Sequence, residues 1–264
     1  MQDLKILCLQ TGIIPDNPEQ NRELLGIKIR SHAEHHDLIV LPEAFTTGFH
    51  VDPEGNAEKA DGETLAWMKK AASETGAVLT GSIFIEDAGK FTNSLIWMRP
   101  DGSYERYDKR HVFSMGGEDK QVSKGTSQLI VELKGWKIKP MICYDLRFPV
   151  WVKNTMENDT YAYDLALFVA NWPEVRAYPW IQLLKARAIE NLAYVVGVNR
   201  IGHDTTGTYY DGDSMIVDPK GKVLEHAGEG KERVLSATLN YEELRTFREK
   251  FNVGPDWDKF EINI

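Results

Sequence analysis

The sequence predicts an α/β fold in which two mixed β-sheets stack face to face with helices on the outside. Short apolar runs rich in β-branched residues alternate with segments of helical periodicity, a pattern typical of α/β proteins. A strand-turn segment also occurs twice, at 94–102 and at 214–221, and this recurrence suggests two related halves. Each half would then contribute one sheet together with its own helices.

The first half begins with a β-α-β unit. Strands are predicted at 4–9 and 37–41, and the segment 17–36 between them carries apolar side chains at helical spacing. A helix at 63–74 and a strand at 77–85 follow. Residues 91–107 then suit an antiparallel hairpin, because Pro100 and Gly102 form a turn sequence between two strand-like runs.

The second half repeats the alternation. It contains predicted strands at 137–143, 164–170, 193–198 and 234–239, and a predicted helix at 179–191. No Ser/Gly-rich or Pro-rich linker interrupts the chain, so one domain over 1–264 is expected. The segment 252–264 has no helical period, and we expect an arm that contacts a neighbouring subunit or docks on its own domain.

Composition excludes several classes of protein. The chain has 264 residues and a net charge of −9, which argues against a nucleic-acid partner because phosphate binding needs a cationic face. No stretch approaches the roughly 18 apolar residues of a membrane span. Two cysteines are too few for a disulfide framework, and the N-terminus lacks the pattern of a signal peptide, so a cytoplasmic protein is expected.

No cofactor or metal is indicated by the sequence. The phosphate-binding loop and the dinucleotide-binding glycine pattern are both absent from it. His32, His35 and His36 have spacings that suit a metal, but His32 and His36 continue the stripe of Leu25 and Ile29, and no acid or cysteine partner is evident. Packed or surface histidines are therefore expected.

Three residues with reactive side chains follow directly after apolar or strand-like runs. Glu43 follows the second strand, Lys109 follows the hairpin, and Cys143 ends the strand at 137–143. Side chains at strand ends emerge into a crevice in α/β folds, so these positions are candidates for chemistry. Taken singly, each also has an ordinary interpretation as a solvated acid, a surface lysine or a small buried cysteine.

The sequence around these residues resembles the nitrilase, or carbon–nitrogen hydrolase, superfamily. The segments Leu41-Pro42-Glu43-Ala44-Phe45, Tyr107-Asp108-Lys109-Arg110-His111 and Ile142-Cys143-Tyr144-Asp145-Leu146-Arg147-Phe148-Pro149 are similar to its three catalytic signatures. Later blocks, among them Ala170-Asn171-Trp172-Pro173, are similar as well. The resemblance extends from Lys5 to about Leu239 and implies an αββα four-layer sandwich with a cofactor-free Glu–Lys–Cys triad.

The resemblance assigns a role to each triad residue. A free thiol is only a few per cent thiolate at neutral pH, so Cys143 needs a base, for which Glu43 is the candidate. Lys109 would stabilise the thiolate and the oxyanion, with help from the backbone N–H of Tyr144. Glu118 matches a further glutamate of the family and would orient Lys109 or the substrate, although a solvated loop acid is the alternative.

The sequence after the nucleophile is most similar to the ω-amidase group, which implies 2-oxoglutaramate or succinamate as substrate. Arg147 would then bind the far carboxylate of the substrate, unless it only pairs with a neighbouring Asp. We expect Phe45, Phe113 and Trp172 to form pocket walls. A hydrolase of N-carbamoyl compounds or nitriles is the nearest alternative, and a non-catalytic binding protein is another. The family resemblance also implies a homodimer or larger assembly.

Overall fold

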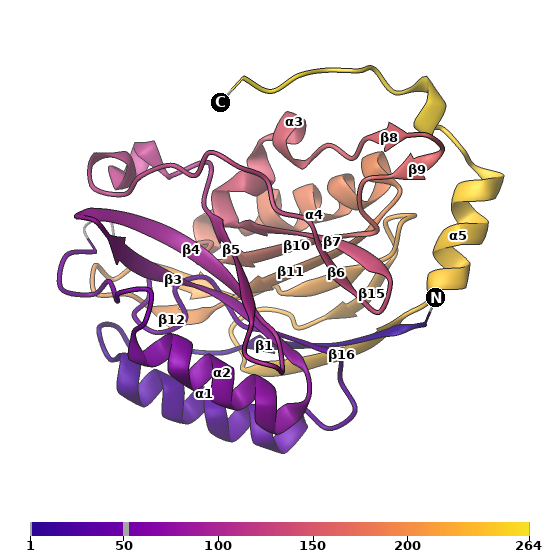
Figure 1. The fold of residues 1–264 in the computed structure, drawn as a ribbon. Helices are drawn as coiled ribbons and strands as arrows, with labels where there is room; N and C mark the ends of the chain where they lie inside the picture. Colours follow the sequence, from indigo (N-terminus) through magenta and orange to yellow (C-terminus); the bar gives the residue numbers. More distant parts are fainter. Residues whose placement is uncertain (1, 50–52, 264) are drawn as a thin grey trace.

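The structure is a computed structural model that describes residues 2–49 and 53–263. Two six-stranded sheets stack on each other, and helices cover the two outer faces, with α1 and α2 on one side and α3 and α4 on the other (Figure 1). This arrangement confirms the predicted αββα sandwich.

The first sheet is mixed and contains both the first and the last strand of the chain. Its strand order is β16 (Arg233–Leu239), β1 (Leu4–Gln10), β2 (Leu38–Val40), β3 (Val78–Asp87), β4 (Lys90–Met98) and β5 (Tyr104–Asp108). The β1/β2 and β2/β3 pairs are parallel, whereas the other pairs are antiparallel. Because β16 pairs along the whole of β1, the chain closes onto its own beginning.

The second sheet repeats the directions of the first. Its order is β6 (Val131–Leu133), β7 (Trp136–Ile142), β10 (Leu165–Ala170), β11 (Tyr194–Asn199), β14 (Met215–Val217) and β15 (Val223–His226). Here β7/β10 and β10/β11 are the parallel pairs, and the others are antiparallel. Both sheets thus read antiparallel, parallel, parallel, antiparallel, antiparallel, and the two-halves prediction is confirmed at the level of topology.

Helices α1 (Pro18–His32) and α2 (Glu63–Thr75) cover the first sheet. Asn17 caps α1 by accepting a hydrogen bond from the backbone N–H of Gln20, which satisfies a donor that the first helical turn leaves free. The helix is shorter than predicted at its carboxyl end, where Ala33 already lies outside it.

Burial on both faces explains why β1 is almost wholly apolar. Leu4, Ile6 and Cys8 belong to the core cluster that contains the buried residues of the second sheet, whereas Leu7 and Leu9 pack with residues of α1 and α2. Successive side chains of a strand point to opposite faces, so one strand serves two apolar layers.

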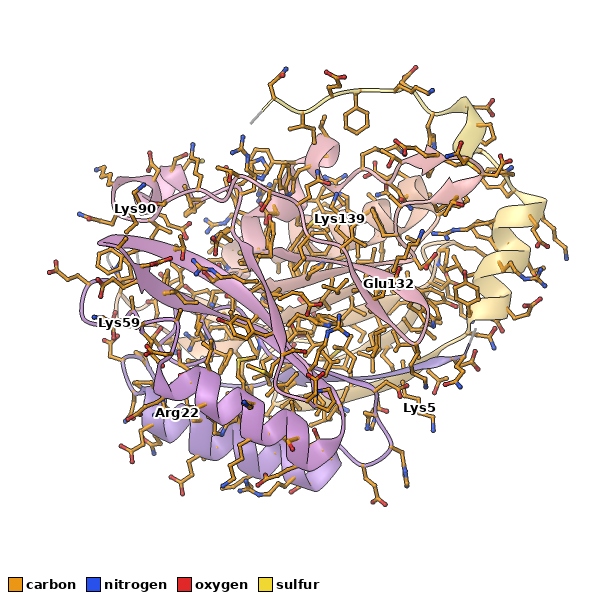
Figure 2. All side chains as sticks on the ribbon, in the orientation of Figure 1. Lys5, Arg22, Lys59, Lys90, Glu132 and Lys139 are labelled. Atoms are coloured by element: carbon orange, nitrogen blue, oxygen red, sulfur yellow. The ribbon has the colours of Figure 1, made fainter. Side chains whose placement is uncertain are left out.

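The outer face of the second sheet carries α3 (Pro149–Val152) and the longer α4 (Ala177–Asn191). A buried lysine, Lys139, points from β7 into this region (Figure 2). Its Nζ donates to the carbonyl oxygen of Trp151 at 2.6 Å and to Oε1 of Gln128 at 3.1 Å. Burial lowers the pKa of Lys139 to about 8.

Helix α5 (Tyr241–Lys250) was not predicted from the sequence. Arg248 holds it against the second half by donating to Asp164 and to the carbonyl oxygens of Leu192 and Tyr163. The chain then turns back over α3 (Figure 1), and the Trp257 ring lies 5.6 Å from the Tyr161 ring. This part of the tail therefore docks on its own domain.

Two short hairpins complete the fold. They are β8 (Met156–Glu157) with β9 (Thr160–Tyr161), and β12 (Ile201–His203) with β13 (Tyr209–Asp211). Within the described residues, no helix is long and apolar enough to span a membrane.

Candidate active site

Glu43, Lys109 and Cys143 come together where strands of the two sheets end. Glu43 follows β2, Lys109 follows β5, and Cys143 follows β7. All three side chains are buried. Strands β2 and β7 belong to the parallel part of each sheet, so their carboxyl ends bring an acid from one half beside a thiol from the other.

Both carboxylate oxygens of Glu43 are held by donors. Oε1 accepts from Nδ2 of Asn93 at 2.8 Å and from Nζ of Lys109 at 3.0 Å. Oε2 accepts from the backbone N–H of Asn171 at 2.7 Å. Asn171 follows β10, the counterpart of β2 in the second half, so the equivalent strand ends of the two halves are joined by this hydrogen bond.

Lys109 is clamped between two carboxylates. Its Nζ lies 3.0 Å from Oε1 of Glu43 and 3.0 Å from Oε2 of Glu118, and 5.1 Å from the centre of the Phe49 ring. Burial alone would lower the pKa of Lys109, but the charges of Glu118, Glu43 and Cys143 raise it above its ordinary value. The ammonium is therefore charged throughout the physiological range.

Glu118 is a buried partner of Lys109 and not a solvated loop acid. It begins the short 3₁₀ helix η2 (Glu118–Lys120), and its side chain also accepts from the backbone N–H of Phe113. Burial and the Glu43 carboxylate raise the pKa of Glu118, against the opposing effect of Lys109. The loop acid is thus folded back onto the lysine that precedes it in sequence.

Cys143 sits on a sharp strand-to-helix turn. Strand β7 ends at Ile142, and Cys143 starts the 3₁₀ helix η3 (Cys143–Arg147) with a φ of +44°, a left-handed conformation that is strained for a residue with a side chain. Its Sγ lies 3.8 Å from the carbonyl oxygen of Asn171. The Glu43 carboxylate lies near enough to the Cys143 thiol to affect its pKa through a side-chain hydrogen bond.

The thiol rests in its neutral form. Burial raises the pKa of Cys143 well above its usual value, and the Glu43 carboxylate raises it further, while Lys109 acts in the opposite direction. Two carboxylates face one ammonium around this sulfur. A resting thiol therefore has to lose its proton during attack, and Glu43 is the adjacent acceptor.

Asp145 fixes the turn that carries Cys143. Its Oδ2 accepts from the Ile142 backbone N–H at 3.0 Å and from the Tyr107 hydroxyl at 2.7 Å. Its Oδ1 accepts from the backbone N–H and Nδ1 of His111, at 3.0 and 2.8 Å. Since Tyr107 and His111 flank Lys109 in sequence, one buried carboxylate positions both the nucleophile and the lysine.

A cavity of about 790 Å³ opens over Cys143. Its lining includes Lys109, Tyr144, Arg147, Phe113 and Trp172, all of which the sequence had singled out. It also includes residues the sequence did not suggest, namely Phe49, Arg176 and Tyr209–Tyr210 of β13. These four residues come from a loop, a short 3₁₀ helix and a hairpin that carry no recognisable motif.

Phe45 corrects one prediction. It was expected in the pocket wall, but it is fully buried and packs in the core between the first sheet and α2, with its ring 5.9 Å from that of Trp67. It lies close to Gly81 of β3, where a Cβ would come within 2.8 Å of the Phe45 ring. Phe49, four residues further along, lines the cavity instead.

Arg147 faces the cavity without a carboxylate partner among the described residues. Its guanidinium lies 4.8 Å from the centre of the Trp172 ring. The nearby Asp145, which was the alternative partner, receives its hydrogen bonds from Ile142, Tyr107 and His111 instead. The Arg147 fork is thus available to an anion in the cavity.

Known proteins are similar to this chain in sequence and in fold. The profile of the family described as carbon-nitrogen hydrolase matches residues 8–249. The chain belongs to the carbon–nitrogen hydrolase family. The fold of this hydrolase is similar to that of a CN-hydrolase superfamily protein from Xanthomonas campestris, whose crystal structure has an arsenic adduct in the active site. The two superpose with a TM-score of 0.97 over 100% of each chain, at 41% identity.

Curated relatives of this carbon–nitrogen hydrolase include amidases. The chain is 41% identical to the omega-amidase YafV of Yersinia enterocolitica, over 98% of its own length and 99% of that protein. It is 32% identical to the 2-oxoglutaramate amidase of Bacillus subtilis, over 95% and 96% of the two chains. Membership of the family makes this chain an amide-hydrolysing enzyme.

Within the described residues, no group of three or more His, Cys, Asp and Glu side chains has the arrangement of a metal site. His32 is exposed, with Nδ1 bonded to the Lys28 carbonyl, and His36 contacts Ser236.

Arg187 and Glu190, on α4, form an ion pair at 2.8 Å. Arg187 also donates to the carbonyl oxygen of Leu146, which belongs to η3.

Proposed function

We propose that this carbon–nitrogen hydrolase is an ω-amidase, which hydrolyses the terminal amide of small dicarboxylic monoamides such as 2-oxoglutaramate and succinamate. The observation that carries this proposal is Arg147, which has no carboxylate partner among the described residues and lies in the same cavity as the Glu43–Lys109–Cys143 cluster. A guanidinium fork binds a carboxylate through two parallel hydrogen bonds. It therefore selects amides whose other end is an anion.

The reaction begins with acylation of Cys143. The thiol proton passes to Glu43 as Sγ attacks the amide carbon, and the carbonyl oxygen becomes an oxyanion. Glu43 then returns the proton to the amide nitrogen, the C–N bond breaks, and ammonia leaves a thioester on Cys143. The two steps need one carboxylate beside the sulfur, which the Asn93 and Asn171 hydrogen bonds keep in place.

Deacylation uses the same groups in the reverse sense. Glu43 takes a proton from water, which attacks the thioester carbon through a second oxyanion. The C–S bond breaks, Cys143 recovers its proton from Glu43, and the dicarboxylic acid is released. No histidine is needed, because one carboxylate accepts and returns a proton in each half of the cycle.

Lys109 and Tyr144 stabilise the oxyanion in this scheme. An ammonium has three donors; two of them are directed at Glu43 and Glu118, which leaves one for the cavity that Lys109 lines. The backbone N–H of Tyr144 lies in the first turn of η3, next to the sulfur. Preorganised donors of this kind contribute the largest part of catalysis in many acyl transfers.

Ammonia release from a substrate panel tests the proposal. Succinamate and 2-oxoglutaramate should release ammonia, and quenched reactions analysed by mass spectrometry should show an acyl adduct on Cys143. Cys8, the other free cysteine, is buried in the core and serves as the control thiol in the same digest. Release of ammonia from carbamoyl amines or nitriles but not from the monoamides would contradict the proposal, and the absence of any adduct would favour a binding protein.

We also propose that the enzyme is a cytoplasmic homodimer or larger homo-oligomer. Apolar side chains project from the outer surface formed by α3, η4 (Glu174–Arg176) and α4: Val150, Val175, Tyr178 and Ile189. Exposed large apolar side chains support contact with a second copy. Light scattering should give at least twice the 30.0 kDa of one chain, and cell fractionation tests the location.

A further inference from the structure

A second arginine, Arg176, lines the catalytic cavity together with Arg147. It ends the short 3₁₀ helix η4, and its guanidinium lies 5.3 Å from the centre of the Phe113 ring. Arg147 lies over Trp172, whose indole N–H donates to the carbonyl oxygen of Arg176 at 2.7 Å. The Trp172 side chain therefore contacts the guanidinium of Arg147 and the backbone carbonyl of Arg176. Both arginines line the cavity above Cys143.

Arg176 has no ion-pair partner within 4 Å among the described residues. Glu174 also lines the cavity, but it is exposed and makes no ion pair with Arg176 within that distance. The other lining acid, Asp204, accepts hydrogen bonds from Thr206 and Thr208 of its own loop and from the Tyr210 hydroxyl. Neither acid neutralises the guanidinium directly.

The carboxylates around the cavity explain why a second cation, Arg176, is needed to bind an anionic substrate. The chain carries a net charge of −9, and the catalytic cluster itself contains two carboxylates against one ammonium. Charges beyond about 8 Å are largely screened at physiological ionic strength, so the charges at the cavity itself decide whether an anion enters. With the lining acids Glu174 and Asp204 included, the cluster and the cavity hold four carboxylates against the three cations Lys109, Arg147 and Arg176. Loss of Arg176 would leave two cations against four acids.

We propose that Arg176 is a specificity-determining residue that, together with Arg147, recognises a 2-oxo carboxylate end of the substrate. The inference rests on the proposed ω-amidase function and names the substrate class within it. A 2-oxo acid presents three oxygen acceptors in adjacent positions. The Arg147 fork takes the two carboxylate oxygens, and Arg176 donates to the 2-oxo oxygen.

The same pair of guanidinium groups excludes amino acid amides. L-Glutamine carries an ammonium group where 2-oxoglutaramate carries its 2-oxo oxygen, and that ammonium would face Arg176. Like charges placed together at a binding site oppose the wrong ligand by several kcal/mol. The order of preference is therefore 2-oxoglutaramate, then glutaramate, which has neither group, and then glutamine.

Kinetics of Arg176→Gln with these three amides test the proposal. For 2-oxoglutaramate, kcat/KM should fall about 10- to 100-fold, the effect of losing one charge-assisted hydrogen bond. The value for glutaramate should change several-fold less, and the preference over glutamine should narrow. Arg147→Gln should instead lower all three alike. Lys5→Gln removes the same charge at the amino end of β1, on the surface (Figure 2), and should change none of them.

A binding measurement separates recognition from effects on the chemical step. With Cys143→Ala as background, calorimetry should show that Arg176→Gln weakens 2-oxoglutarate much more than glutarate. Equal loss of kcat/KM for all three amides, or equal loss of affinity for the two diacids, would overturn the role of Arg176 while leaving the ω-amidase proposal intact. Wild-type enzyme that hydrolyses none of the three would overturn both.

Discussion

Asp145→Asn tests whether one buried carboxylate holds the nucleophile turn in place. Asp145 is fully buried, and each of its oxygens accepts two hydrogen bonds. An amide has a single oxygen, so whichever way Asn lies, its NH₂ group faces two donors. The Tyr107 hydroxyl already accepts from the Trp151 indole N–H at 3.0 Å, and it would lose the acceptor for its own proton.

The expected magnitude follows from this count. Leaving a buried donor unsatisfied costs about 1–3 kcal/mol, so two such donors lower the free energy of unfolding by about 2–6 kcal/mol. Because Ile142 and His111 are among the donors, the turn at Cys143 and the residues beside Lys109 also shift. We therefore expect kcat to fall along with stability.

Urea unfolding monitored by circular dichroism gives the stability change, and ammonia release gives kcat. Asp108→Asn is the matched control at the neighbouring strand end. Among the described residues, the hydrogen bonds to the Asp108 side chain all go to Oδ1, from Ser94 and Arg106, both at 2.6 Å, so an amide oxygen can keep both. The free energy of unfolding of Asp108→Asn should fall by less than about 1 kcal/mol, as expected for a partly exposed ion pair. A loss for Asp145→Asn no larger than that of the control would refute the reasoning.

Three further predictions follow from buried titratable groups. Glu118→Gln replaces the second carboxylate on Lys109 and should lower kcat by about 10- to 100-fold with little change in KM, because a charge-assisted hydrogen bond is worth about 1.5–3 kcal/mol; an unchanged kcat in steady-state assays would show that Glu118 is only structural. Alkylation of Cys143 by iodoacetamide should be slow at neutral pH and accelerate as pH rises, because burial raises the pKa of that thiol well above its usual value. A neutral rate as fast as that of an exposed model thiol, or a rate independent of pH, would contradict this account. Lys139 has a folded-state pKa of about 8 against an ordinary value of 10.5, so between these pH values the unfolded chain binds more protons than the folded one. The contribution of Lys139 to the free energy of unfolding therefore rises by about 3 kcal/mol from pH 8 to 10.5. Urea titrations of wild type and Lys139→Met over this pH range should diverge by that amount, and parallel curves would contradict the prediction.

The central strands were predictable because both faces of each sheet are buried, whereas the only strand pairing predicted was the hairpin at 91–107. Burial makes central strands continuous apolar runs, and the hairpin β4–β5 with its turn at Pro100 and Gly102 appears in the sequence twice, the second time at β14–β15. Helix α5 was missed although Tyr241, Leu244 and Phe247 stand at helical spacing along it, so this element could have been predicted from its apolar stripe.

The site residues were predictable where a motif contains them. Glu43, Lys109 and Cys143 each stand inside a signature, and the structure brings them together. Phe45 also lies in such a signature, yet its side chain points into the core, since a motif can be shared for packing as well as chemistry. Arg176 lies outside the matched signatures, so only its orientation toward the cavity singles it out.

The repeated strand order of the two halves divides the enzyme's working parts unevenly. The first half, up to η2, supplies the proton carrier and the lysine with both of its carboxylate partners, whereas the second half supplies the sulfur and the two cavity arginines. Neither repeat is an enzyme in miniature, and the sheet of the first half also takes up β16 from the end of the chain. Cutting the chain between β5 and β6 should thus give two fragments that are each inert and that recover turnover only when mixed and reassociated.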